Sequence, residues 1–276
     1  MILSAEAGQK LEWAILATIT TLVLLVTLAP IVMVAVISFT SGETLAFPPP
    51  SWSLRWYRSA VTMITSGSDV QGFVDSILTT FRITVTVTLI AGIMGVLAAY
   101  ALVRFEFRGK WLIEELITLP LVFPLIVLGI ALLIMASQLG FGSGFWRIVI
   151  GHLIVTLPFM VRNCTSSLQG LNPALEEAAR TLGARPIRLF IEIILPQMRS
   201  GILAGAILVF IISFNEFTVA YFLYTVDAYP LSIWLFSRGT NALDPTIFSL
   251  STIIIVFDLG LLWLLDRVVG ERSISI

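Results

Sequence analysis

The chain alternates between long apolar runs and short polar segments. Six of the apolar runs are about as long as the ~20 residues that a helix needs to cross a bilayer, and they cover residues 13–39, 76–103, 111–137, 147–168, 201–224 and 246–265. The short alternating strands of a membrane β-barrel are not seen in the sequence. A helix also satisfies its own backbone hydrogen bonds within lipid. The pattern therefore predicts an all-α integral membrane protein with six transmembrane helices.

Composition agrees with a membrane location. Charged residues make up 12% of the chain and hydrophobic residues 58%, whereas soluble domains are about 25% charged. The net charge of −1 argues against a nucleic-acid partner. Cys164 is the single cysteine and His152 the single histidine, so the sequence holds neither an internal disulfide nor a recognisable metal motif. We expect no metal site.

The charges also predict an orientation. The first apolar run follows Glu6, Lys10 and Glu12 rather than a basic segment, so we expect a retained anchor and not a cleaved signal peptide. Six spans place both termini on one side. That side carries 11 of the 16 Lys and Arg residues and the other side carries five. The excess of positive charge predicts that both termini are cytoplasmic.

Two of the predicted outer loops have a character of their own. The loop over residues 40–75 contains FPPPSWSLRWYRS, which predicts a rigid turn followed by an amphipathic helix at the outer interface. The last outer loop contains TVDAYPLSIWLFSRGTNALDP. About half of it is apolar, so we expect it to re-enter the membrane or lie flat on it.

The inner stretch EEAARTLGARPIRLFIEIILP, residues 176–196, interrupts the apolar pattern with charges. Asn172 and Pro173 predict the start of a short helix, Gly183 predicts its left-handed end, and Pro186 can start a second helix. An interfacial connector with solvated charges is one interpretation. A connector needs only a few residues, however, and residues 169–199 form a segment of about thirty, which favours a docking element for a soluble partner.

The same stretch carries a resemblance to a known family. Glu177-Ala178-Ala179, Gly183, Ile193 and Leu195-Pro196 match the spacing of the E-A-A…G…I-x-L-P loop of permease subunits in bacterial binding-protein-dependent ABC importers. The chain resembles the type I importer fold throughout, with the loop between the fourth and fifth spans. FPPPSWSLRWYRS and ISFNEFTVAYFL are similar to the subfamily that imports spermidine, putrescine and related compounds.

The resemblance implies one permease domain over residues 1–276, in which the loop at 169–199 seats in a cleft of an ATPase subunit. Glu177 would meet a basic residue there, Ala178 and Ala179 would allow close packing, and Gly183 would form the corner. The full set of expected coupling residues is Glu176, Glu177, Ala178, Ala179, Gly183, Arg185, Leu195 and Pro196.

No G-x-x-x-x-G-K-[ST] phosphate loop is present in the sequence. We therefore expect a non-catalytic subunit without a cofactor of its own, with ATP bound by a separate ATPase dimer. The resemblance further implies a second permease subunit, a periplasmic or lipid-anchored solute-binding protein, contact with membrane lipid, and a place in the bacterial cytoplasmic (inner) membrane.

Glu216 lies within the fifth apolar run, and an ionisable group there is a functional candidate. One interpretation is structural: it pairs with a neighbouring helix or is protonated. The other is an anionic point in the solute path, since a cation would neutralise it and nearby rings could add cation–π attraction. Similar polyamine permeases often carry an Asp/Glu pair where this chain has Asn-Glu. The hypothesis predicts a small cationic or zwitterionic amine as solute, with the path residues Phe214, Asn215, Glu216, Phe217 and Tyr221.

Other polar residues within the apolar runs are expected to be structural. Asp258 could pair with Arg162, and Arg82 could extend to the outer face. His152 and Asn163 are expected to form hydrogen bonds between helices.

Small residues and prolines predict how the spans pack and bend. Gly201 and Gly205 form a G-x-x-x-G pattern that permits close helix contact, either within the chain or between subunits. Pro120, Pro124 and Pro158 are expected to kink the third and fourth spans.

Two other functional classes are alternatives for a chain with this pattern. A proton-coupled secondary transporter would use Glu216 and Asp258 as proton sites, but it predicts internal symmetry between halves, and none is evident in the sequence. An intramembrane enzyme would need a nucleophile with a base or a metal set, and His152 has no evident partner in the sequence.

Overall fold

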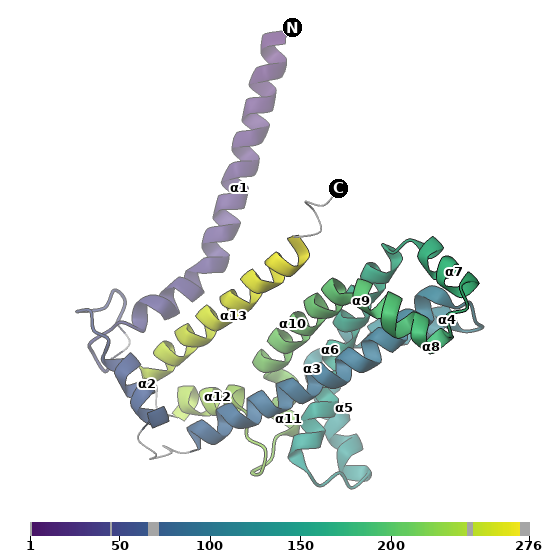
Figure 1. The fold of residues 1–276 in the computed structure, drawn as a ribbon. Helices are drawn as coiled ribbons and strands as arrows, with labels where there is room; N and C mark the ends of the chain where they lie inside the picture. Colours follow the sequence, from purple (N-terminus) through teal and green to yellow (C-terminus); the bar gives the residue numbers. More distant parts are fainter. Residues whose placement is uncertain (1, 45, 66–71, 242–244, 271–276) are drawn as a thin grey trace. The chain divides into compact units, whose positions relative to one another are not determined.

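The computed structural model describes residues 2–44, 46–65, 72–241 and 245–270 (Figure 1). These residues form helices and no β-strand, with only isolated bridges at Thr40–Trp52 and Thr225–Ala228. Four helices in the described part are long and apolar enough to cross a membrane, or up to six if each of two bent helix pairs is one span. The prediction of an all-helical membrane protein is confirmed.

The chain separates into two compact units, and each is described by itself. The first comprises Met1–Ser68 and Arg238–Val256. It contains α1 (Ile2–Ile37), α2 (Arg55–Thr65) and the start of α13 (Thr246–Gly270). The hydroxyl of Ser249 in α13 donates a hydrogen bond of 3.2 Å to the backbone carbonyl of Trp56 in α2. The helix predicted after the three prolines is therefore present as α2.

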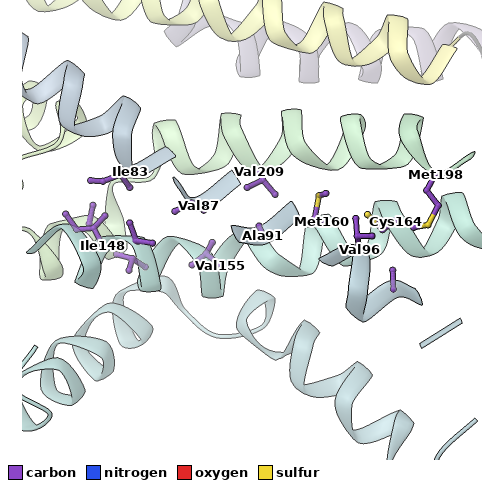
Figure 2. Packing of buried hydrophobic residues seen from close by; sticks show 14 of the residues in the cluster. Ile83, Val87, Ala91, Val96, Ile148, Val155, Met160, Cys164, Met198 and Val209 are labelled. Carbon is purple, nitrogen blue, oxygen red and sulfur yellow. The ribbon is translucent and has the colours of Figure 1, made fainter. Parts of the chain in front are cut away.

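The second unit comprises Asp69–Ser237 and Phe257–Ile276. Its core lies among three helices that pack on one another: α3 (Phe73–Arg104), α6 (Gly144–Gln169) and α10 (Arg199–Asn215). Figure 2 shows the apolar residues that fill the space between them. The fully buried members shown there include Ile83, Val87, Ala91, Ile148, Met160, Cys164 and Val209.

The Gly201-x-x-x-Gly205 pattern brings α10 close to α6. A Cβ atom on Gly201 would lie 2.8 Å from the backbone oxygen of Asn163, and one on Gly205 would lie 2.5 Å from Sδ of Met160. Side chains at these two positions would collide with α6, so only glycine allows the observed approach. The close contact that the pattern predicts is therefore made within the chain.

The third predicted span, 111–137, is not one straight helix. The segment from α4 (Lys110–Thr118) through the 3-10 turn η1 (Leu119–Leu121) meets α5 (Leu125–Gln138) at an angle of 105°. Pro120 lies at the start of η1 and Pro124 directly precedes α5. Neither proline can donate a backbone hydrogen bond, which accounts for the break. By contrast, α6 continues through Pro158 as one helix.

The fifth predicted span, 201–224, is also broken. α10 ends at Asn215, and Glu216 follows in an extended conformation with φ −67° and ψ 118°. A short helix, α11 (Thr218–Leu223), then begins. The expectation of one continuous helix is wrong here, because hydropathy reports apolar length and is blind to a local change of backbone direction.

The segment predicted to be the last outer loop, which was expected to re-enter the membrane or lie flat, contains a helix. α12 (Leu231–Asn241) begins beside the start of α3, where the hydroxyl of Thr80 accepts a hydrogen bond of 2.7 Å from the Leu231 backbone N–H. The rings of Phe73 and Trp234 lie 4.8 Å apart. Leu231, Ile233 and Trp234 of this segment are thus buried against the protein.

Candidate functional site

The charged stretch folds into the predicted pair of short helices. α7 (Pro173–Thr181) starts at Asn172, whose Oδ1 accepts a hydrogen bond of 3.0 Å from the Ala174 N–H. Gly183 follows with φ 83°, the left-handed conformation expected of the corner. α8 (Pro186–Leu189) then leads through a π-helical turn, η2 (Phe190–Ile194), into α9 (Leu195–Gln197). The local prediction of a helix, a glycine corner and a second helix is confirmed.

Glu176 points inward and joins this loop to the membrane helices. Arg104 at the end of α3 donates from Nε to Oε1 of Glu176 at 2.7 Å, and its Nη2 lies 2.6 Å from the same oxygen. Arg104 also donates to the backbone carbonyl of Leu168 at the end of α6. The Glu176 residue is only 6% exposed. Its carboxylate is therefore directed at the chain itself and not at the exposed side of the loop.

The opposite side of the loop is exposed. Glu177 and Ala178 lie on the surface of α7, whereas Ala179 is buried against the chain itself. Leu182 is 88% exposed and Ile187 is 75% exposed on either side of the corner. Arg185 is also exposed; Leu195 is half-buried and Pro196 exposed. We define the docking face as the exposed residues Glu177, Ala178, Leu182, Arg185 and Ile187.

Glu216 has partners that the sequence did not reveal. Both of its carboxylate oxygens accept hydrogen bonds from the Val219 N–H at 2.9 and 3.0 Å, and one also accepts from the Ala220 N–H at 2.9 Å. The carboxylate therefore caps the start of α11. Nε2 of His152 in α6 lies 3.4 Å from Oε2. These contacts agree with the structural interpretation, in which Glu216 has a partner on a neighbouring helix.

His152 also joins two helices as expected. Its Nδ1 lies 3.0 Å from the Ser213 hydroxyl in α10, and its residue is 2% exposed. The only sequence signal for this cluster was the coincidence of one histidine and one glutamate in apolar surroundings. Nothing local links them, because they belong to different helices.

Two expectations about polar partners are wrong. Asp258 accepts a hydrogen bond of 2.9 Å from Nδ2 of Asn215, and within the described residues Arg162 forms no ion pair with it. Nδ2 of Asn163 donates to the Phe159 carbonyl of its own helix at 2.8 Å instead of bridging to another helix.

The predicted path residues fall into different aromatic groups. Phe214 stacks on Phe210, with ring centroids 5.9 Å apart, and Phe257 lies 5.5 Å from Phe214. Beyond the break, Phe217 lies 5.5 Å from Tyr221 and 4.9 Å from Phe236.

Two cavities open at the two ends of the second unit. The first, of about 550 Å³, is lined by Lys110, Glu114 and Arg162 among others, which is where Arg162 points. The second, of about 540 Å³, lies between the start of α3 and the segment joining α11 to α12. We call the second one the outer pocket; its polar and aromatic lining residues include Asp75, Thr79, Arg82, Tyr224, Asp227 and Tyr229. No local pattern in the sequence predicts this pocket, because its lining residues come from two distant segments.

The sequence is similar to those of known permease subunits. The chain is 29% identical over 245 residues to the spermidine/putrescine transport system permease protein PotC of Haemophilus influenzae, with 88% of this chain and 92% of the relative covered. It is 30% identical over 234 residues to the putrescine transport system permease protein PotI of Escherichia coli, covering 82% and 80%. It is also 28% identical over 244 residues to the sulfate transport system permease protein CysT of Salmonella typhimurium, covering 80% and 85%.

A solved structure shares the fold. The chain matches a bacterial ABC transporter involved in the import of the acidic polysaccharide alginate, with a TM-score of 0.65 over 97% of this chain and 98% of that one, at 17% identity. The family described as "Binding-protein-dependent transport system inner membrane component" matches residues 91–270, which is more than half of the sequence. The chain belongs to this family and is a multi-pass permease subunit of a bacterial ABC importer.

Proposed function

We propose that the chain is the pore-forming subunit of an ATP-driven importer that carries a small cationic or zwitterionic amine, similar to a polyamine, across the inner membrane. Two relatives are named for spermidine or putrescine transport. A third is named for sulfate, so family membership alone allows a different class of solute. The amine is supported by the greater number of polyamine-type relatives reported above and by the acidic and aromatic lining of the outer pocket.

The proposed topology has six spans with both termini in the cytoplasm. It counts α4 to α5 as one broken span and α10 with α11, over residues 201–224, as another; the α8 to α9 segment, which meets α10 at 68°, belongs to the cytoplasmic loop. Irregular backbone inside a membrane is tolerated where protein or a water-filled cavity surrounds it. The break at Glu216 fits that condition, because the residue is 7% exposed and its carboxylate is fully engaged by backbone N–H groups.

The observation that carries the proposal is the docking face. Leu182 and Ile187 are large apolar side chains that the chain leaves almost uncovered at a turn rich in charge. Such residues gain free energy when a partner buries them. We propose that a separate ATPase dimer, which binds the ATP, covers this face, and that Glu177 meets a basic group in its cleft. The permease itself catalyses no reaction.

The same loop gives a route for coupling. The ion pair between Arg104 and Glu176 ties α7 to the ends of α3 and α6. A movement of the docked loop would therefore be passed to the helices that form the core. ATP shifts the equilibrium between inward- and outward-facing states only to the extent that the two states dock differently.

The solute path is proposed to run beside the break in the fifth span, near Phe214, Asn215, Glu216, Phe217 and Tyr221. Glu216 would act there chiefly by fixing the start of α11. The proposed further partners are a second permease subunit and a periplasmic or lipid-anchored solute-binding protein.

The test reconstitutes the chain with its ATPase and second permease in liposomes. Uptake of putrescine, 4-aminobutyrate and sulfate, each delivered by the cognate receptor, is measured with ATP and with a proton gradient alone. ATP-dependent uptake of an amine is expected. Uptake of sulfate only would remove the amine, and uptake driven by the proton gradient alone would favour a secondary transporter.

A further inference from the structure

The outer pocket gathers charges of both signs on two facing segments. Asp75 and Arg82 come from α3, and Asp227 comes from the segment between α11 and α12. Asp75 and Arg82 are seven residues apart, or about two helical turns and 10 Å along the axis. They therefore share one face of α3 but line the pocket at different levels, with Asp75 nearer the start of the helix.

These charged side chains form no ion pairs with one another within the described residues. Within the part of the chain that the structure describes, Asp75 takes part in no ion pair or side-chain hydrogen bond, and the Arg82 guanidinium forms no ion pair. Asp227 accepts a hydrogen bond of 2.7 Å from the Thr225 hydroxyl. That bond holds the pKa of the exposed Asp227 carboxyl below its usual value, with Arg147 adding a weaker attraction. The Asp227 carboxylate is thus ionised at neutral pH, and Asp75 lines the same cavity.

Two tyrosines complete the lining opposite α3. The rings of Tyr224 and Tyr229 pack edge to face with centroids 5.6 Å apart, and both residues line the cavity. A ring face attracts an organic cation, and the ring itself can cover a short methylene chain. The volume of about 540 Å³ is ample for a small linear amine.

We infer that the outer pocket receives the ammonium group of a small alkylamine, held between Asp75 and Asp227 with Tyr224 and Tyr229 against its methylene chain. This inference rests on the proposed function, since it assigns the entry site for the same solute class. Arg82 lies further along α3 and repels a second ammonium group. The affinity for a diamine is therefore low, because only one of its two ammonium groups is attracted. A low affinity suits a site that solute must leave during transport.

Substitutions of the acidic and of the basic lining residues are expected to change the affinity for putrescine in opposite directions. Asp75→Asn and Asp227→Asn each remove one attraction and are expected to weaken binding of putrescine about fivefold, the factor for one unit-charge contact in water. Arg82→Gln removes a repulsion and is expected to tighten it by a few-fold. Tyr229→Leu keeps an apolar side chain but removes the ring, and should weaken binding.

Binding of putrescine is measured by calorimetry on the full importer complex, without its receptor, in nanodiscs of zwitterionic lipid. Glu43→Gln is the matched control, because Glu43 is an exposed carboxylate of the first outer loop that does not line the pocket. Its variant should bind putrescine as the wild-type complex does. Assembly of every variant is checked by gel filtration, so that a loss of subunits is not read as a loss of affinity.

A lysine of the receptor could supply the same ammonium chemistry, so docking of the solute-free receptor is measured on the same variants. Unchanged docking together with weaker putrescine binding supports the inference. Wild-type putrescine affinity in the Asp75→Asn, Asp227→Asn double variant overturns it, and weakened receptor docking alone would assign the pocket to the receptor instead. If the complex imports putrescine while the double variant still binds it normally, only this inference fails and the proposed function stands.

Discussion

The carboxylate of Glu216 and the imidazole of His152 meet in the buried interior, with Nε2 of His152 3.4 Å from Oε2 of Glu216. The same carboxylate accepts hydrogen bonds from the first free N–H groups of α11. A buried carboxylate is costly unless it is hydrogen-bonded or paired, and here backbone N–H groups supply the hydrogen bonds while the His152 ring lies beside the carboxylate. The pair therefore stabilises a change of direction in the chain that an uninterrupted helix would not make.

Substitution of Glu216 tests this role. Glu216→Gln retains one acceptor oxygen but leaves fewer bonds for the Val219 and Ala220 N–H groups, so we expect the complex to lose about 1–3 kcal/mol of stability. Uptake at a receptor-saturating solute concentration should fall strongly, because the start of α11 is displaced. His152→Asn should share part of the loss. Normal melting temperature together with reduced uptake would instead favour a direct contact between Glu216 and the solute.

The ion pair between Arg104 and Glu176 predicts a second effect. Their side chains are 15% and 8% exposed, so removing one partner leaves a buried charge and should cost about 3–5 kcal/mol before solvent relaxation reduces it. We expect Arg104→Met to lower co-purification of the ATPase because α7 is released. The double variant Arg104→Met, Glu176→Met should recover much of the yield, and a double variant as poor as the single one would contradict the pairing argument.

Gly183 should tolerate substitutions in an order set by backbone preference alone. A Cβ at this position meets no atom within 4 Å, but φ is 83°. We expect a cost of about 1–2 kcal/mol for Gly183→Ala, less for Gly183→Asn and more for Gly183→Val. Solute uptake and ATPase co-purification should fall in that order, while membrane insertion is unaffected. Equal activity of the Val and Asn variants would show that the corner conformation is not required.

The docking face predicts losses of assembly without losses of folding. Leu182→Ser and Ile187→Ser remove apolar area that the chain itself does not cover, so each should weaken ATPase binding about five- to thirtyfold and leave the melting temperature of the permease unchanged. Glu177→Arg should do the same by repelling a basic cleft. Leu139→Ser is the control, since Leu139 is 65% exposed at the end of α5. An unchanged ATPase affinity in all three variants would remove the docking role.

The close contact between α10 and α6 at the G-x-x-x-G pattern predicts that a larger residue at Gly201 lowers stability. Gly201→Ala adds a methyl group that overlaps α6, so a loss of about 1–3 kcal/mol is expected. Gly260→Ala in α13 meets nothing within 4 Å and should be neutral or stabilising by up to ~1 kcal/mol. Thermal unfolding of the two purified variants, compared side by side, checks the prediction, and equal melting temperatures would argue against the close contact.

Local features of the chain were set by the sequence alone. The apolar runs determined which segments form membrane helices, because the length needed to cross a bilayer is fixed by helix geometry. Asn172, Pro173, Gly183 and Pro186 determined the helix-corner-helix of the loop, because capping and left-handed backbone depend on single residues and their neighbours. The structure confirms the elements of the loop and four of the six apolar runs as long helices, whereas the runs at 111–137 and 201–224 are broken.

Partners across the chain were decided only by the tertiary structure. Arg104 and Glu176 are 72 residues apart, and His152 and Ser213 are 61 apart, so no periodic pattern connects them. The same holds for the outer pocket, whose carboxylates come from the start of α3 and from the segment after α11. The break at Glu216 also belongs here. Its carboxylate is hydrogen-bonded locally by the Val219 and Ala220 N–H groups, but the His152 ring beside it comes from a helix far away in the sequence.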